Sequence, residues 1–280
     1  MIDPVATDWA EAILRGIAAA PAERLDLGEA ALALASLERK QVGLERYRDH
    51  LSALCRDVAT AAGSSLATLA GRIAALNETI IGQHGYRGDA DTYDDLQNAN
   101  LMRVIDRRRG LPVTLGILYI HAARAQGWDM VGLSFPGHFL VRLEAPDGRA
   151  IIDPFHEGSR PDAGALRKLL RGTAGDEAEL APEHYEPVSD RAILLRLQNN
   201  IKLRLIGADR IAKAAQVIES MLIFAPDQPD LWREVGLLHA HLGNLGAANA
   251  AIERFLALSD DSAARHTMAA LLQRLRTKLN

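Results

Sequence analysis

The segment of residues 103–155 constrains the fold more strongly than any other part of the chain. It contains a Gly-Leu-Pro turn, and the ring of Pro112 suits the first turn of a helix, which we expect over residues 113–126. This predicted helix is apolar along nearly its whole length, so we expect it to be buried on most sides. Such a helix needs other elements packed against several of its faces.

Three short strands are predicted after this helix. They lie at residues 130–135, 139–143 and 150–152, and a Pro-Asp-Gly turn separates the last two. His138 lies near the start of the second strand, and Asp153 ends the third. A hairpin would bring these two side chains together, and a carboxylate beside an imidazole fixes the tautomer of the ring. The sequence therefore predicts a small antiparallel sheet that carries a His–Asp pair.

Helical periodicity fills most of the remaining chain. Apolar residues recur at helical spacing before residue 82 and again from residue 190 onward. Between residues 84 and 100, Asp and Asn are dense and compete with helix for backbone hydrogen bonds, so we expect a structured loop. We divide the chain into a helical N-terminal region, a core and a helical C-terminal region, at residues 1–82, 83–188 and 189–280. Outside the core strands and their helix, the predicted helices before the C-terminal region span residues 5–20, 27–39, 44–62, 64–81, 100–109 and 164–170.

The C-terminal region repeats itself. Ala214 and Ile218 of one copy correspond to Ala248 and Ile252 of the next. The period matches the tetratricopeptide repeat, which is about 34 residues long. The W-x2-L-G-x2-Y pattern of that repeat is filled in the second copy by Trp232, Val235, Gly236 and His239.

Composition and charge narrow the class of protein. The chain has 280 residues, a net charge of -4 and 48% hydrophobic residues, which fits a globular protein with a sizeable core and gives no nucleic-acid signature. No apolar run is long enough for a transmembrane helix, and the first residues show no secretory signal, so we expect no membrane partner. Cys55 is the single cysteine, which excludes an intrachain disulfide and suits a reducing cytoplasm.

Four motifs together resemble the transglutaminase-like core of bacterial SirB-type proteins. They are G-Y-R-G-D, N-A-N-L-x2-V-I-D-R-R-R-G-L-P-V-T-L, F-P-G-H-F-L-V-R and I-I-D-P-F-x2-G. A helical N-terminal region and a tetratricopeptide tail also belong to that family's architecture, so the resemblance covers most of the chain. It implies an α+β fold that is mainly helical, with a papain-like or transglutaminase-like core, a small antiparallel sheet and C-terminal tetratricopeptide-like helical hairpins.

The resemblance assigns roles to residues of the core. Active transglutaminases place a Cys at the start of the central helix and His and Asp on adjacent strands, and His138 and Asp153 match that His and Asp. Pro112 stands where the Cys is expected, so the alignment supplies no thiol. Thr114 lies shortly after it and is a weak nucleophile unless an adjacent base activates it. The candidate catalytic residues are therefore His138, Asp153 and Thr114.

Three functions remain open. The first is a regulatory or peptide- and protein-binding protein without thiol catalysis, a pseudoenzyme in which a cleft beside His138 and Asp153, or the helical repeats, takes a partner. The alternative is a hydrolase or acyl transferase with His138 as base, Asp153 as the residue that orients it, and Thr114 or water as nucleophile. A third is a scaffold in which only the helical tail works.

The basic run beside the helix start supplies candidate binding residues. Arg107 and Arg109 suit a phosphate or an acidic peptide, although a charge run is more often a solvated face. Pro112 and Phe139 complete the set of candidate binding residues. The partner we expect is a peptide or protein, and the sequence leaves the oligomeric state open.

A metal site and a cofactor are not expected. The metal-ligand residue types His138, Asp153, His156 and Glu157 lie near one another in sequence, but no H-x3-H or C-x2-C spacing supports a metal, and we predict none. No P-loop and no G-x-G-x-x-G motif occurs, so we expect no nucleotide cofactor.

Overall fold

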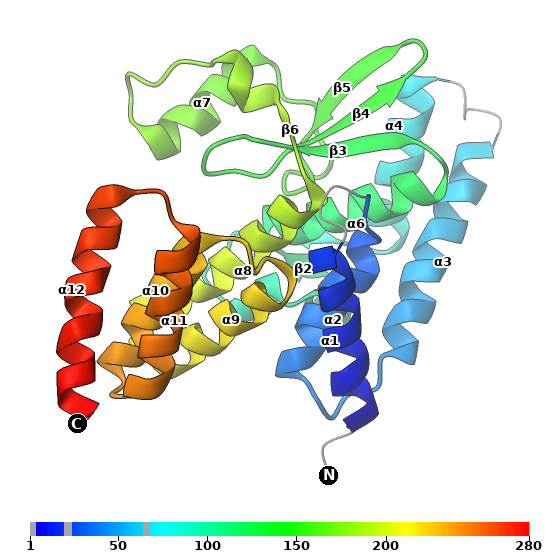
Figure 1. Cartoon of the computed structure of the whole chain (residues 1–280). Helices are drawn as coiled ribbons and strands as arrows, with labels where there is room; N and C mark the ends of the chain where they lie inside the picture. Colours follow the sequence, from blue (N-terminus) through cyan, green and yellow to red (C-terminus); the bar gives the residue numbers. More distant parts are fainter. Residues whose placement is uncertain (1–3, 20–23, 64–67, 280) are drawn as a thin grey trace. The chain divides into compact units, whose positions relative to one another are not determined.

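The computed structural model (Figure 1) describes residues 4–19, 24–63 and 68–279. The chain forms two compact units, Met1–Ala10 with Ala22–Leu197, and Glu11–Pro21 with Gln198–Asn280. Helices predominate, and a small antiparallel sheet lies in the first unit, which confirms the predicted fold class. The division into three regions at residues 82 and 188 stays a prediction. No helix in the described part of the chain has both the length and the apolarity needed to cross a bilayer.

The helices that precede the sheet follow the predicted pattern closely. Asp26 caps the start of α2, where its carboxylate accepts from the Glu29 amide at 3.0 Å. Thr68 caps α4 in the same way, and α4 continues directly into a π-helical turn, η2. The first residues of the helix predicted over 64–81 lie outside the described residues. The elements are α1 (Pro4–Ala19), α2 (Leu27–Glu38), α3 (Glu45–Ala62), α4 (Leu69–Asn77), η2 (Glu78–Gln83) and α5 (Leu101–Arg107).

Helix α6 (Pro112–Ala125) lies at the centre of the first unit, as predicted from its apolar sequence. It contacts α2, α3 and α4 as well as strands β3 (Asp129–Leu133) and β4 (Val141–Ala145), so little of its surface reaches water (Figure 1). Gly116 is needed for this packing, because a Cβ there would lie 2.4 Å from the Phe139 ring. Pro112 at the first turn begins the helix without losing a backbone hydrogen bond.

The sheet has the strand order β5-β4-β3-β6, and all neighbours are antiparallel. Strand β5 spans Gly148–Ile152, and β6 is the short strand Pro187–Val188. The predicted strands at 130–135 and 139–143 have wrong boundaries, because β3 ends at Leu133 and β4 begins at Val141. The connection closes with a hydrogen bond from the Leu133 amide to the Leu140 carbonyl, and Gly137 turns the chain at a φ of 71°.

The polar segment predicted as a structured loop contains two short elements. Strand β1 (Arg87–Gly88) pairs in parallel with β2 (Arg109–Gly110), and a 3-10 turn, η3, spans Leu96–Ala99. Asp and Asn side chains satisfy the local backbone as expected, since Asn100 accepts from the Arg103 amide at the start of α5. After the sheet come α7 (Ala163–Ala174), which contains the helix predicted at 164–170, and the 3-10 turn η4 (Pro182–Tyr185).

Paired helices make up the second unit. Helix α8 (Asp190–Gly207) contributes residues to both units, and α9 (Ile211–Phe224), α10 (Pro229–His241), α11 (Leu245–Leu258) and α12 (Ser262–Leu279) follow. Successive helices from α9 to α12 contact one another. The Gly of the repeat pattern, Gly236, allows α10 and α11 to approach closely, because a Cβ there would lie 3.0 Å from Ile252. His239 in the same pattern pairs with Glu219 at 3.0 Å.

Candidate functional site

The β4–β5 hairpin brings His138 and Asp153 together, as the sequence predicts. Val141 pairs with Ile152, so the residues just before β4 and just after β5 meet at the same end of the hairpin. His138 therefore lies in the turn before β4 rather than within the strand. Its Nε2 atom is 2.9 Å from both carboxylate oxygens of Asp153. The second ring nitrogen, Nδ1, faces away from this carboxylate.

The Asp153 carboxylate is almost fully buried and has several donors around it. Its side chain is 2% exposed, and Oδ1 accepts from the backbone amides of Phe155 and His156 at 3.0 and 3.3 Å. Burial alone would raise the pKa of this carboxyl, but the hydrogen bonds from His138 and His156 outweigh it and hold the pKa below its usual value. The ionised carboxylate is thus the form that the site stabilises.

His156 joins this pair through a tight turn. Its Nδ1 atom lies 2.8 Å from Asp153 Oδ2, and its ring stacks on the His138 ring with centroids 5.6 Å apart. The sequence named His156 only as a possible metal ligand, and the signal for its position is the spacing of three residues from Asp153 across a turn. Glu157 follows with an exposed side chain and is not part of this cluster.

The start of α6 places the candidate residues Pro112 and Thr114 in the interior. Pro112 and Thr114 are both buried. The Thr114 hydroxyl donates a hydrogen bond to the Asn98 carbonyl at 2.9 Å, within the turn that precedes α5. Among the residues that the structure describes, no hydrogen bond joins Thr114 to His138.

Two arginines of the basic run, Arg107 and Arg109, form ion pairs with aspartates of the polar segment 84–100. Arg107 binds buried Asp89 at 2.9 Å and also donates to Asn98. Asp89 is buried, which alone would raise its pKa, but hydrogen bonds from Thr92 and Arg107 lower the pKa of this carboxyl to about 2. Arg109 has the more exposed side chain and lies 3.5 Å from Asp91.

Phe139, the last candidate binding residue, lies in the interior. Its ring fills the space left by Gly116 and Gly132, where a Cβ would come within 2.4 and 2.6 Å of it. The Arg196 guanidinium lies over the ring at 5.6 Å and donates to the His138 carbonyl at 2.8 Å. In this position Phe139 supports the turn that carries His138.

A second imidazole–carboxylate pair lies elsewhere in the first unit. His121 of α6 places Nδ1 3.1 Å from Asp26 Oδ1, and its ring also has a side-chain hydrogen bond with Cys55 of α3. Burial alone would lower the pKa of His121, but the hydrogen bonds with Asp26 and Cys55 raise it to about 10. Cys55 is half-buried.

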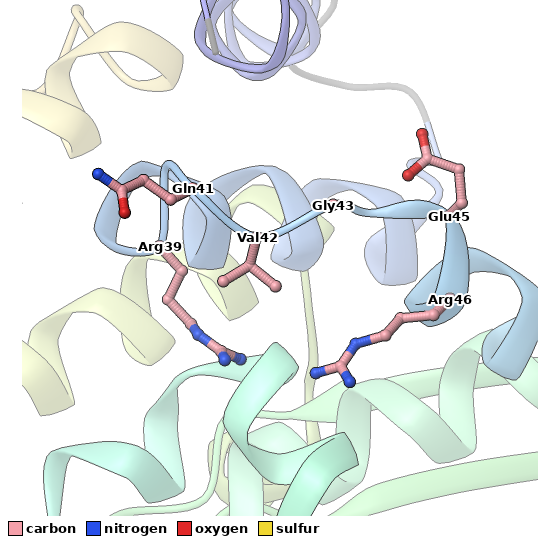
Figure 2. Close-up of a pocket in the computed structure, with 6 residues that line it drawn as sticks. All are labelled: Arg39, Gln41, Val42, Gly43, Glu45 and Arg46. Atoms are coloured by element: carbon pink, nitrogen blue, oxygen red, sulfur yellow. The ribbon is translucent and has the colours of Figure 1, made fainter. Parts of the chain in front are cut away.

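The loop between α2 and α3 borders an open pocket of about 620 Å³ (Figure 2). Arg39 and Arg46 reach from the two ends of this loop toward the same side, with Val42 between them. Both guanidinium groups bind Asp106 of α5, at 2.9 and 2.8 Å. The pocket therefore has its two cations already paired, and its lining residues are distinct from those around His138 and Asp153.

Comparison with known proteins identifies both parts of the chain. The family model of the transglutaminase-like superfamily matches residues 45–199, and that of the tetratricopeptide repeat matches residues 201–273. A UPF0162 protein of Xylella fastidiosa (strain Temecula1) is 37% identical over 191 residues, which cover 67% of this chain and 68% of the relative. A UPF0162 protein of Vibrio cholerae is 30% identical over 221 residues, covering 79% and 81% of the two chains.

Protein SirB1 of Salmonella typhimurium is a further relative. It is 27% identical over 162 residues, which cover 58% of this chain and 60% of SirB1. The matched core contains the His138–Asp153 hairpin and the Pro-initiated helix, while the repeats follow it. The chain therefore belongs to the transglutaminase-like superfamily, in the family of UPF0162 proteins and SirB1, and carries a C-terminal tetratricopeptide-repeat region.

Proposed function

We propose that this chain is a regulatory protein that binds a peptide or protein segment and does not use thiol catalysis. The start of α6 carries the proposal: the resemblance aligns Pro112 with the Cys of active transglutaminases, and the Thr114 hydroxyl is buried against a backbone carbonyl. A hydroxyl nucleophile must give its proton to a base, and this hydroxyl donates its hydrogen bond to Asn98 instead. The His–Asp pair is thus kept without a thiol in α6.

Aromatic side chains beside the pair favour binding of a partner. The Tyr93 ring, 37% exposed, lies edge-on to Phe155 with centroids 5.7 Å apart, and Phe155 contacts His156 at 5.3 Å. Partly exposed aromatic rings are enriched among the residues that dominate binding energy at interfaces. Strand β5 is an edge strand that leads directly into Asp153. An extended peptide can add to such an edge through main-chain hydrogen bonds.

The repeat region offers a second surface. Leu237 of α10 and Leu203 of α8 are large apolar residues with exposed side chains. Stacked helical repeats commonly present such residues to a partner across an extended face. The proposed binding protein therefore has two surfaces that single substitutions distinguish.

A peptide-display screen on the full chain tests the proposal. Enriched peptides are measured by fluorescence polarisation against wild type, Tyr93→Ala and Leu237→Ala, each of which changes a partly exposed side chain and serves as the control for the other. We expect one variant to weaken binding about tenfold or more, as truncation of an interface aromatic or apolar anchor does. Failure to enrich any peptide, or equal affinity for all three proteins, contradicts the proposal.

A hydrolase is the second candidate function, and the intact geometry of His138 and Asp153 favours it. With Nε2 held by the carboxylate, Nδ1 is the nitrogen available to take a proton from water. Ester and peptide substrates are screened with wild type, His138→Ala and Thr114→Ala. Turnover that is lost in His138→Ala but kept in Thr114→Ala supports a water nucleophile. Turnover that survives in His138→Ala contradicts this candidate.

A further inference from the structure

Three metal-binding side chains converge at the turn after β5. His138, Asp153 and His156 each present one donor atom, and the three atoms lie within 4.8 Å of one another. His138 Nε2 is 2.9 Å and His156 Nδ1 is 2.8 Å from the same carboxylate oxygen, Asp153 Oδ2. Two imidazole nitrogens and one carboxylate oxygen thus point into one small volume. The sequence names these residues as metal-ligand types but predicts no site, because their spacing matches none of the common metal motifs.

We propose that His138, Asp153 and His156 form a mononuclear site for a divalent first-row transition-metal ion, with Zn²⁺ as the leading candidate. Two imidazoles and one carboxylate are the donor set of several catalytic zinc sites, which keep a fourth position open for water. The same set binds non-haem iron. Mg²⁺ and Ca²⁺ prefer oxygen ligands throughout, so the two ring nitrogens disfavour them.

The distances fit an ion after a small adjustment. Zinc bonds of about 2.0–2.1 Å in a tetrahedral arrangement separate the ligand atoms by about 3.4 Å, so the two nitrogens must each move about half an ångström from Oδ2. His156 has room for this movement, since its side chain is 56% exposed. In the hydrogen-bonded form, ring N–H groups donate to Oδ2, and a bound cation takes the place of those protons.

The Asp153 carboxylate is already oriented for this role. Backbone amides of Phe155 and His156 hold Oδ1, whereas Oδ2 faces His156 and, like Oδ1, lies 2.9 Å from His138 Nε2. The turn closes on itself through hydrogen bonds from the Asp153 amide to the Ser159 carbonyl at 2.8 Å and from the Gly158 amide to the Asp153 carbonyl at 2.9 Å. Partners of this kind, outside the ligands themselves, typically set the orientation of metal-binding side chains.

Helices α4 and α6 hold the turn at Gly158, whereas the His156 side of the turn is exposed to solvent. Gly158 sits so closely on α4 and α6 that a Cβ would lie 2.1 Å from Asn77 Oδ1 and 2.5 Å from the Tyr119 hydroxyl. Asn77 also donates to the Gly158 carbonyl at 3.0 Å. His156 faces solvent, so the open coordination position of the ion would be reached from that side. The site is therefore rigid at Asp153 and adjustable at His156.

Zinc titration of the full-length, untagged chain tests the proposal. The protein is stripped with a chelator and titrated with Zn²⁺ alone, by calorimetry and by competition with a chromophoric chelator. The variants are His156→Ala and a matched control, His266→Ala, which removes an exposed imidazole from α12. We expect one Zn²⁺ per chain for wild type and His266→Ala, and an affinity at least about tenfold weaker for His156→Ala, since loss of even an outer partner of a metal ligand has that effect.

Two results would overturn the proposal. One is equal zinc affinity in wild type and His156→Ala, and the other is equal weakening in His156→Ala and His266→Ala, which would indicate adventitious surface binding. Because His156 is exposed, its variant should fold, and thermal unfolding checks this. Co²⁺ gives a second readout, since its visible bands should appear with wild type and be lost in His138→Gln. Metal binding is measured without peptide, so this proposal and the peptide-binding proposal fail independently.

Discussion

His138 with Asp153 and His121 with Asp26 are both imidazole–carboxylate pairs, yet the surroundings of the two carboxylates differ. Asp153 is buried and receives backbone amides as well as two rings. The Asp26 side chain is 61% exposed. Its carboxylate accepts a hydrogen bond from the Glu29 amide at the start of α2 and also pairs with His121. The Cys55 thiol lies beside the second pair, whereas α6, which precedes the first pair in the chain, contains no cysteine.

A His, an acid and a Cys that lie close together form a catalytic site only if the pKa of the imidazole suits a base. At His121 the ring joins three helices, and its pKa is raised to about 10, so it is a poor base near neutral pH. At His138 the Asp153 carboxylate is held in place by backbone amides and binds the imidazole, but α6 contains no thiol.

Removing the buried carboxylate should have the largest effect on stability. Asp153→Ala leaves His138 and the amides of Phe155 and His156 without their acceptor, and we expect a loss of about 3 kcal/mol in the free energy of unfolding. Urea unfolding followed by circular dichroism measures it, and Asp153→Asn keeps the shape as a control. A loss below about 1 kcal/mol would show that the cluster is not held by this carboxylate.

Removing the exposed carboxylate should cost less. Asp26→Ala deletes a helix cap, and we expect a loss of about 1 kcal/mol. The control is Asp162→Ala, because Asp162 caps α7 through the Ala165 amide without a neighbouring imidazole. The difference between the two variants isolates the contribution of His121. An equal loss in both would mean that the His121–Asp26 pair adds no measurable stability.

The two imidazole–carboxylate pairs should lose their contributions to the free energy of unfolding at opposite ends of the pH scale. The folded state raises the pKa of His121 from 6.5 to about 10, so its contribution is complete below about pH 6.5 and is lost as the pH rises through about 10. The lowered pKa of Asp153 gives a contribution that is present above the ordinary aspartate pKa of 3.8 and is lost as the pH falls below it. Urea midpoints across pH should therefore decline less on the alkaline side in His121→Gln than in wild type. An unchanged alkaline decline would contradict the raised pKa.

The contact with the thiol should have the smallest effect. Cys55→Ala removes one of the hydrogen bonds that raise the pKa of His121, so the pKa should fall. Asp26→Asn should also lower it, because the hydrogen bond with Asp26 is the largest of the causes that raise this pKa. NMR titration of the His121 ring protons measures both changes. A pKa unmoved by Cys55→Ala would mean that the thiol plays no part in this pair.

The sequence predicts the His138–Asp153 pair because antiparallel pairing of neighbouring strands is a local relation. Pro112 and the apolar run behind it likewise predict a buried central helix, and the repeat pattern around Trp232 and Gly236 predicts the helical hairpins. Each of these three predictions depends on the spacing of residues along the sequence, and regular secondary structure fixes where residues at that spacing lie.

Other parts of the site depend on contacts that spacing does not reveal. His156 reaches Asp153 only because the turn is tight and Gly158, at a φ of 63°, fits against Asn77 and Tyr119. The Thr114 hydroxyl finds its acceptor 16 positions earlier, at the Asn98 carbonyl in η3, through a contact that no strand pairing or helical spacing sets. Phe139 lies just before β4, which starts at Val141 rather than at the predicted residue, and its ring packs against Gly116 and Gly132.

The hairpin geometry also bears on the order of folding. His138 and Asp153 are separated by 15 positions, whereas the Asp190 carboxylate joins Arg124 across 66 positions and the Leu25 amide across 165. Closing a short loop loses less chain entropy than closing a long one, and local contacts form faster. We therefore expect the hairpin to assemble before the ends of the first unit are joined. A nascent chain would then present its two-histidine cluster while much of the surrounding core is still unmade.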